Sequence, residues 1–425
     1  MNIAEVIRLV NTNRGNGKKE NLNRMYLLME KLGNPQKRLK FIHIAGTNGK
    51  GTTAAFIASI LGETALKTGL FTSPHLEVIN ERIKIDQKNI SDEAFILFTE
   101  RVVSSVEEVE LELSEKLYSF EILTAIALLY FAEQQCDMVI LETGIGGRLD
   151  STNIIQSPEV AAITSIGLDH MGMLGNTAEE IAKEKAGIIK SNSIVITCFL
   201  EGSLREIFER KATQEGASLL MINPKDVEVV SASMKGQIFR YKDFKKLRIR
   251  MIGEHQLSNA SIAIEVAKAL KNKGYNVTEQ SIKLGLEKAF WAGRMEKLLE
   301  EPTVITDGAH NKQGVELLSK NLRTLFPDQK FTFVVGMMRD KGYMDMIEKV
   351  GDLASLFLTV SPDPGRGFDA ETVAYDLRDK GYLAQSKKQT SEVIHYIKNK
   401  ARKNEIIVVF GSLYLVGDLR KQLIQ

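Results

Sequence analysis

The stretch FIHIAGTNGKGTT, residues 41–53, determines how the N-terminal half of the chain folds. Residues 41–45 have the apolar pattern of a buried strand, residues 46–52 are rich in glycine, and a helical pattern follows over residues 53–67. A strand that leads into a helix through such a turn directs backbone N–H groups and the positive end of the helix toward one point. The stretch therefore predicts an α/β domain with a phosphate-binding loop.

The seven residues of the loop are Gly46, Thr47, Asn48, Gly49, Lys50, Gly51 and Thr52. We expect Lys50 to supply a positive charge to the phosphates and Thr52 to supply a hydroxyl near the metal ion. The spacing departs from the standard Walker pattern, because Ile44 occupies the place of the first glycine and Gly51 separates the lysine from Thr52. A glycine-rich turn without a ligand is the alternative. No NKxD sequence follows, which favours an adenine nucleotide over a guanine nucleotide.

The composition is that of a globular protein with more than one domain. Its 425 residues suggest two domains, and 44% hydrophobic residues can fill two cores. The formal net charge of +2 gives no reason to expect nucleic acid or a membrane as a partner. Cys136 and Cys198 lack metal-ligand spacing, so we expect buried, reduced thiols. The sequence has neither the pattern of a signal peptide nor an apolar stretch of about 20 residues, and we expect a cytoplasmic protein.

Further apolar strands alternate with helical patterns along the chain. In the first half they are predicted at residues 138–141, 160–164 and 194–197. Strands separated by helices are typical of a parallel sheet flanked by helices. The alternation starts again in a second α/β unit, with strands predicted at residues 303–306, 332–335, 357–360 and 406–410. Residues 226–250 differ, because short alternating stretches there predict antiparallel strands.

Polar residues that follow predicted strands are candidates for a magnesium site. Glu142 and His170 follow two of the apolar strands, and Ser73 lies in the sequence TSPH. The carboxyl ends of parallel strands meet at the ligand edge of a sheet, and magnesium prefers oxygen ligands. Taken singly, each residue is equally compatible with an ordinary loop. Their shared position after strands predicts a metal site near the phosphates.

Lys185 is unusual because it lies on the apolar face of a helix predicted at residues 177–189. It is four residues from both Ile181 and Ile189. A buried ammonium group is destabilising, so such a lysine should be paired, have a shifted pKa or be chemically modified. The alternative is that its aliphatic stem lies along the apolar surface while the amine reaches solvent.

Polar side chains also gather at turns in the C-terminal half. Gln256 and Asn259 are one turn apart near the start of a predicted helix, where they either cap the backbone or contact a ligand. Arg294 lies in the turn between the two predicted domains, where a guanidinium can reach a phosphate or remain exposed to solvent. Asp307 and His310 follow the strand at residues 303–306, and a further glycine turn follows the last strand. Both turns are predicted to belong to one site, with packing roles as the alternative.

Ten short sequences resemble the motifs of the Mur ligase superfamily, in its folylpolyglutamate synthase and dihydrofolate synthase branch. They are GTNGKGT (46–52), TSPHL (72–76), NERI (80–83), SFE (119–121), ETGIGGRLDSTN (142–153), LDH (168–170), EKAGIIK (184–190), GRMEK (293–297), DGAHN (307–311) and GSLYL (411–415). Ten matches in one order are far more specific than any one motif. The resemblance implies a P-loop domain at residues 1–293 and a smaller Rossmann-like α/β domain at residues 294–425.

The resemblance also implies a reaction. In the family, ATP phosphorylates the terminal carboxylate of a folate, and the amino group of L-glutamate attacks the acyl phosphate, releasing phosphate. A carboxylate is a poor acyl donor until one oxygen becomes part of a phosphate leaving group, so a phosphate loop suits this chemistry. The implied partners are folate and L-glutamate without nucleic acid or membrane, and we expect a monomer.

The resemblance assigns roles to residues already singled out. Ser73, Glu142 and His170 match magnesium positions, and Lys185 matches a lysine that carries a carbamate and, with it, can hold a second magnesium ion. Nucleotide contacts are implied for Asn259, Arg294 and Asp307. His310, Ser412 and Tyr414 are expected near the incoming glutamate. The implied catalytic residues are Lys50, His170, Lys185 and His310.

Two other functions are compatible with parts of the sequence. A cell-wall ligase of the same superfamily would be expected to have an N-terminal domain for its nucleotide-sugar substrate, and a phosphate loop at residue 46 leaves no room for one. A nucleotide-dependent switch would not need a second domain with polar turns. Whether dihydropteroate is a second acceptor stays open, because both reactions use the same chemistry. Thr52 stands where the family often has serine and keeps the hydroxyl.

Overall fold

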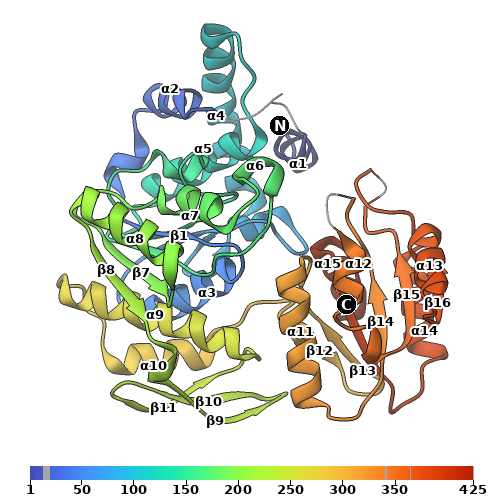
Figure 1. Ribbon diagram of the computed structural model, residues 1–425. Helices are drawn as coiled ribbons and strands as arrows, with labels where there is room; N and C mark the ends of the chain where they lie inside the picture. Colours follow the sequence, from blue (N-terminus) through green and yellow to red (C-terminus); the bar gives the residue numbers. More distant parts are fainter. Residues whose placement is uncertain (13–19, 340–341, 364, 425) are drawn as a thin grey trace. The chain divides into compact units, whose positions relative to one another are not determined.

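The computed structural model describes residues 1–12, 20–339, 342–363 and 365–424 (Figure 1). The chain forms two compact units. Unit 1 comprises Met1–Glu228, Phe239–Arg248 and Gln256–Phe290, and unit 2 comprises Val229–Ile238, Ile249–His255 and Trp291–Gln425. The functional boundary between residues 293 and 294 stays a prediction. No helix in the described ranges is long and apolar enough to cross a membrane.

Unit 1 is built on an eight-stranded sheet. Its strands, in spatial order, are β4 (Lys88–Asn89), β3 (Ile83–Ile85), β2 (Thr68–Phe71), β5 (Met138–Glu142), β1 (Phe41–Ala45), β6 (Val160–Ile163), β7 (Ile194–Cys198) and β8 (Ser218–Ile222). All neighbours from β2 to β8 pair in parallel, whereas β3 and β4 are antiparallel. The predicted parallel sheet and its four apolar strands are confirmed; β2 and β8 were not predicted.

Helices cover both faces of this sheet. One face packs against α1 (Ile3–Asn11), α2 (Asn23–Lys31), α4 (Asp92–Leu113), α5 (Ser119–Glu133), α7 (Ala178–Ala186) and α8 (Gly202–Glu215). The opposite face packs against α3 (Lys50–Leu61), and α10 (Glu279–Lys288) packs on α3 so closely that Gly285 leaves no room for a side chain against Ile60. The predicted helix at residues 53–67 is therefore wrong at its end: α3 stops at Leu61, because residues 68–71 must run back as β2 beside β5.

Residues 227–249 form the predicted antiparallel insertion. The strands β9 (Val227–Ser233), β10 (Gly236–Tyr241) and β11 (Phe244–Ile249) make a three-stranded sheet in the order β11-β10-β9. Two-residue connections join them, which only antiparallel neighbours permit. The buried Tyr241 hydroxyl donates a hydrogen bond of 2.9 Å to Glu265 of α9 (Glu254–Asn272).

Unit 2 has a six-stranded sheet (Figure 1). In spatial order its strands are β12 (Glu296–Leu299), β13 (Thr303–Thr306), β17 (Ile406–Phe410), β14 (Phe331–Val335), β15 (Ala354–Val360) and β16 (Ala384–Lys387), with only β12 antiparallel. On one face lie α11 (Lys312–Leu325), α12 (Tyr343–Ile347) and α13 (Ala370–Asp379). The other helices, α14 (Thr390–Asn399) and α15 (Leu413–Ile424), pack against each other and cover the opposite face. This confirms the predicted second α/β unit.

Candidate functional site

The phosphate loop lies between β1 and α3 and is held in shape by the residues that follow β6. The Thr47 backbone N–H donates to the Ser165 carbonyl at 2.7 Å, and the Thr47 hydroxyl donates to the Gly167 carbonyl at 3.0 Å. The Thr164 hydroxyl donates to the Asn48 carbonyl at 2.7 Å. Gly46 has a φ of 155°, and a Cβ atom there would lie 1.8 Å from the Thr164 oxygen, so no other residue fits. Hydrogen bonds within the chain thus hold the loop in this shape.

Two predicted nucleotide-binding residues lie at this loop, Lys50 within it and Asn259 against Gly49. Lys50 begins α3, and its Nζ donates to the Gly46 carbonyl at 3.1 Å. Asn259, near the start of α9, lies so close that a Cβ on Gly49 would be 2.5 Å from its Oδ1. The Asn259 amide donates to Gln256 Oε1 at 3.0 Å, which fixes its orientation. Capping is therefore not its role; Asn259 faces the phosphate loop.

Glu142 and Ser73 lie together at the carboxyl edge of the sheet, next to the phosphate loop. Glu142 ends β5, is 3% exposed, and its Oε2 accepts a hydrogen bond of 3.1 Å from the Ser73 backbone N–H. Ser73 follows β2, the neighbour of β5, so sheet order brings the two together. His170 lies at a less enclosed place: it precedes the short helix α6 (Met171–Leu174), is exposed, and has a left-handed backbone with φ of 50°. Within the described ranges, no three His, Cys, Asp or Glu side chains form a ready cation site.

Asp150 is a residue of this region that the sequence did not single out. Its Oδ2 accepts hydrogen bonds from the backbone N–H groups of Gly144 and Ile145 at 2.9 and 3.0 Å. Its Oδ1 accepts from the N–H and hydroxyl of Thr152 at 3.0 and 2.6 Å. One carboxylate therefore holds the glycine loop that follows Glu142. The sequence signal was available, because an aspartate before Ser-Thr-Asn is typical of a helix N-cap.

Asp150→Asn is expected to loosen that loop, because an amide nitrogen would face N–H donors where a carboxylate oxygen now accepts. We expect a loss of about 1–3 kcal/mol in the free energy of unfolding, measured by urea denaturation, together with slower turnover. The control is Asp137→Asn, where an exposed carboxylate accepts one backbone hydrogen bond, from Lys67. Equal stability and activity in both variants would show that Asp150 does not hold the loop.

Lys185 is buried, as its place on the apolar face of α7 predicts. The residue is 3% exposed, so the interpretation in which its amine reaches solvent is wrong. Burial, with a further contribution from the positive charge of Lys50, lowers the pKa of Lys185 to about 7, against the opposing effect of Asp169 and Asp150. The amine is therefore partly neutral near neutral pH, and a neutral amine is a nucleophile.

The predicted residues of unit 2 gather at the turn after β13. Asp307 is 9% exposed and accepts hydrogen bonds from the N–H groups of Met295 and Ala309 at 2.9 and 2.8 Å. Burial raises its pKa, although the charge of Arg294 and the two hydrogen bonds oppose the change. Arg294 lies against Gly308, where a Cβ atom would be 2.2 Å from its Nη1. His310 Nδ1 is 2.8 Å from the Gly308 carbonyl.

Main-chain hydrogen bonds join this turn to three other loops at the carboxyl edge of the unit 2 sheet. We call the four the rim loops; their described residues are 307–311, 336–339, 361–363 with 365–368, and 411–414. Gly411 N–H donates to Ala309 at 2.8 Å, and Phe368 N–H donates to Met337 at 2.8 Å. Ser412 is buried, and its Oγ accepts from the Tyr414 N–H at 3.2 Å. The structure thus brings His310, Ser412 and Tyr414 to one edge, and it adds Arg366, which the sequence did not indicate.

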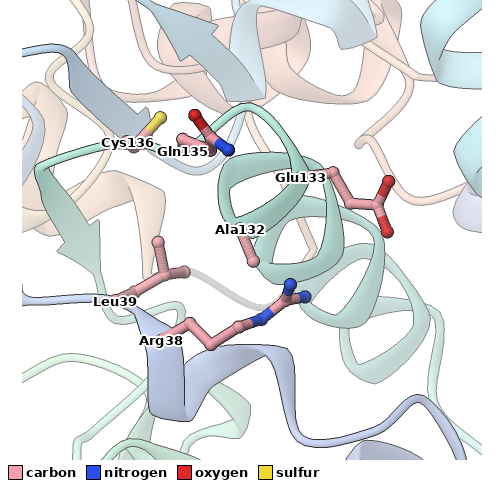
Figure 2. Close-up of a pocket in the computed structure, with 6 residues that line it drawn as sticks. All are labelled: Arg38, Leu39, Ala132, Glu133, Gln135 and Cys136. Atoms are coloured by element: carbon pink, nitrogen blue, oxygen red, sulfur yellow. The ribbon is translucent and has the colours of Figure 1, made fainter.

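A surface pocket of about 520 Å³ lies elsewhere in unit 1 (Figure 2). It is lined by Arg38, Leu39, Ala132, Glu133, Gln135 and Cys136. These residues precede β1 and β5, so the pocket is at the amino ends of the strands, opposite the phosphate loop. Burial raises the pKa of the Cys136 thiol to about 12, which makes it unreactive. Cys198 is also a free thiol but is only partly buried.

Comparisons with known proteins agree with this geometry. Residues 44–267 match the family described as "Mur ligase middle domain", and residues 293–413 match "Mur ligase, glutamate ligase domain". The chain is 38% identical over 418 residues to the dihydrofolate synthase/folylpolyglutamate synthase of Bacillus subtilis, covering 96% of each protein. The structure of the apo form of L. casei FPGS matches with a TM-score of 0.87 at 32% identity, covering 100% of both chains. An FPGS-AMPPCP-folate complex matches with a TM-score of 0.86, also at 32% identity and with full coverage of both.

Proposed function

Because this chain belongs to the Mur ligase superfamily, in its folylpolyglutamate synthase branch, we propose that it joins L-glutamate to the terminal carboxylate of a folate in a reaction driven by ATP. The observation that supports this most directly is the phosphate loop, held by bonds within the chain, beside the buried Glu142 and Ser73, in a chain that matches such ligases over 96% of its length. A similar protein forms a complex with AMPPCP and folate.

The chemistry requires two transfers. A folate carboxylate oxygen attacks the γ-phosphorus of ATP, the bond to the β-phosphate oxygen breaks, and ADP leaves. The glutamate nitrogen then attacks the carbonyl carbon of the acyl phosphate, phosphate leaves, and the nitrogen loses a proton. The loop N–H groups and Lys50 lie where they can neutralise charge that develops on the phosphoryl oxygens.

The residues at the sheet edge fit magnesium. A buried carboxylate in contact with the Ser73 backbone, next to a hydroxyl, offers the hard oxygen donors that magnesium prefers. We assign Ser73, Glu142 and His170 as ligands, and a bound ion would neutralise phosphate charge in this position. Glu142 can serve in this way because Asp150 holds the loop that follows it.

We further propose that Lys185 carries a carbamate. With a pKa of about 7, part of the amine is neutral and can attack carbon dioxide, forming an N–C bond and losing one proton. The product is an anion, which replaces repulsion from Lys50 with attraction and adds oxygen ligands for a second magnesium ion. Asn259, Arg294 and Asp307 are assigned to the nucleotide, and His310, Ser412 and Tyr414 to the surroundings of the incoming glutamate.

ADP release tests the function. Purified protein is given ATP, magnesium and L-glutamate with tetrahydrofolate, with dihydropteroate or with no acceptor. We expect release that requires both glutamate and tetrahydrofolate. Because the similar B. subtilis protein is named for both activities, we also propose release with dihydropteroate. If no ADP is released with either acceptor, the proposed reaction is contradicted. A cytoplasmic location and a monomeric state stay predictions.

A further inference from the structure

Arg366 is a guanidinium fixed in place at the edge of the unit 2 sheet. Its Nη2 donates a hydrogen bond of 2.9 Å to the Tyr414 hydroxyl, and its guanidinium carbon lies 5.1 Å from the centre of the Tyr414 ring. Asp363 accepts from Nη2 at 3.1 Å and from Nε at 3.4 Å. The Asp363 carboxylate is itself held by the backbone N–H groups of Gly365 and Arg366 at 2.8 and 3.0 Å. The ring, the hydroxyl and the carboxylate together hold the guanidinium in one orientation.

The bonds that fix the guanidinium leave one side of it available. They involve Nε and Nη2, whereas Nη1 forms no hydrogen bond with any part of the chain that the structure describes. The side chain is 63% exposed. A planar group with two free N–H donors, held by a ring and a carboxylate, is well suited to bind an external carboxylate.

Arg366 belongs to the rim loops, where His310 and Ser412 also lie. Its own carbonyl accepts the Arg339 N–H at 3.0 Å, and Phe368 in the same loop donates to Met337. This edge is where β17 leads into α15 on one face while β13 and β14 lead into helices on the other face. Ligands of open α/β sheets bind at the carboxyl ends of strands where such a reversal occurs.

The position of Arg366 within the rim loops suits the far end of an amino acid. The turns with His310 and Ser412 follow β13 and β17, which are neighbours, whereas Arg366 comes from the loop after β15, two strands further. Neighbouring strands are about 4.8 Å apart, so the loop with Arg366 begins about 10 Å from the turn with Ser412, and its guanidinium reaches back to Tyr414 at the end of that turn. An α-carboxylate lies beside the reacting nitrogen, and a side-chain carboxylate lies away from it.

We propose that Arg366, oriented by Tyr414 and Asp363, binds the side-chain carboxylate of the incoming amino acid and so selects glutamate. This rests on the proposed ligase function. Every amino acid has an α-carboxylate, so a cation there cannot distinguish glutamate from glutamine. A guanidinium that binds the side-chain carboxylate can distinguish the two amino acids, because the neutral side-chain amide of glutamine would leave the guanidinium without a negative partner.

Steady-state kinetics of Arg366→Ala test this. We expect the KM for L-glutamate to rise about 10- to 100-fold, with kcat and the KM values for ATP and folate changed less than about threefold. The preference of the enzyme for L-glutamate over L-glutamine should fall by a similar factor, an effect that a purely structural role would not produce. Arg323→Ala is the matched control, because Arg323 is another exposed arginine of unit 2 paired with an aspartate, Asp352.

Tyr414→Phe is a second variant, which tests the proposal even if Arg366→Ala fails to fold. It keeps the ring and removes only the hydroxyl that accepts from Arg366, so we expect a smaller rise in the KM for glutamate. If the native protein ligates glutamate and both variants keep its KM and its preference over glutamine, the assignment of Arg366 is overturned. If the native protein releases no ADP with any acceptor, the proposed function fails first, and the assignment falls with it.

Discussion

Lys185→Ala is expected to lower turnover by about 10²- to 10³-fold or more while the protein stays folded. The buried amine lies close enough to Lys50 for the charge of Lys50 to lower its pKa, and we propose that a carbamate on it acts on the phosphoryl transfer. The measurement is ADP release at saturating substrates. Lys183→Ala is the control, because Lys183 is exposed on the same helix.

Two further measurements separate a carbamate from a simple ammonium at this position. Short carboxylates such as acetate should restore part of the activity of Lys185→Ala, because they can replace the missing anion in the space left by the side chain. An ammonium role predicts rescue by small amines instead. Full activity in Lys185→Ala would remove the residue from the mechanism.

The pH dependence of stability follows from the same lysine in its unmodified form. Its folded pKa of about 7 is below the ordinary value of 10.5, so the unfolded state binds the proton more tightly. The unmodified amine therefore destabilises the fold fully below about pH 7, and this effect disappears as the pH rises to 10.5. In carbon dioxide-free buffer, Lys185→Ala should unfold at an equal or higher temperature than the native protein, with the difference largest at low pH.

Lys50→Ala is expected to weaken ATP use by about 10³-fold in kcat/KM, because the loop would lose its lysine charge where phosphoryl charge develops. The variant loses the hydrogen bond from Lys50 Nζ to the Gly46 carbonyl, but the loop should keep its shape, since Thr47, Asn48 and the segment after β6 supply its other bonds. Kinetics with varied ATP and an ADP-binding measurement test this. Lys288→Ala, which removes an exposed lysine paired with Glu63, is the control. An unchanged affinity for ATP and an unchanged rate would mean that the loop has been misinterpreted.

The strands of the parallel sheets that the sequence predicted are those that are largely buried. Residues 41–45 and 138–142 are buried throughout and mainly apolar, with His43 and Glu142 as the polar exceptions, and they form the centre of the unit 1 sheet. In contrast, β2 contains Gly69, which ordinarily argues against a strand; the glycine is there because a Cβ atom would lie 2.8 Å from the Phe131 ring of α5. A contact between residues 62 positions apart has no local signal. The edge strand β8 is only partly buried, which also weakens its pattern.

The same limit applies to the site. Glu142 was found because it ends a predicted strand, whereas Ser73 was found in the sequence TSPH without the strand β2 before it being predicted. The order β2-β5 in the sheet then places the two residues together. Lys185 was found because the spacing of apolar residues along a helix predicts which of its side chains are buried. Arg366 could not be found in this way, because its partner Tyr414 is 48 residues away and nothing near Arg366 in sequence distinguishes it from other exposed arginines.

The rim loops are joined to each other through backbone atoms, so the bonds between the loops do not depend on the side chains of Arg366 and Tyr414. Gly411 bonds to Ala309, Gly336 to Phe410 and Phe368 to Met337, each through an N–H and a carbonyl that every amino acid except proline supplies. The side chains of Arg366 and Tyr414 can therefore be replaced while these backbone bonds remain. Descendants of such a protein could acquire a different amino-acid substrate through few mutations, and a library randomised at Arg366 and Tyr414 offers the same route in the laboratory.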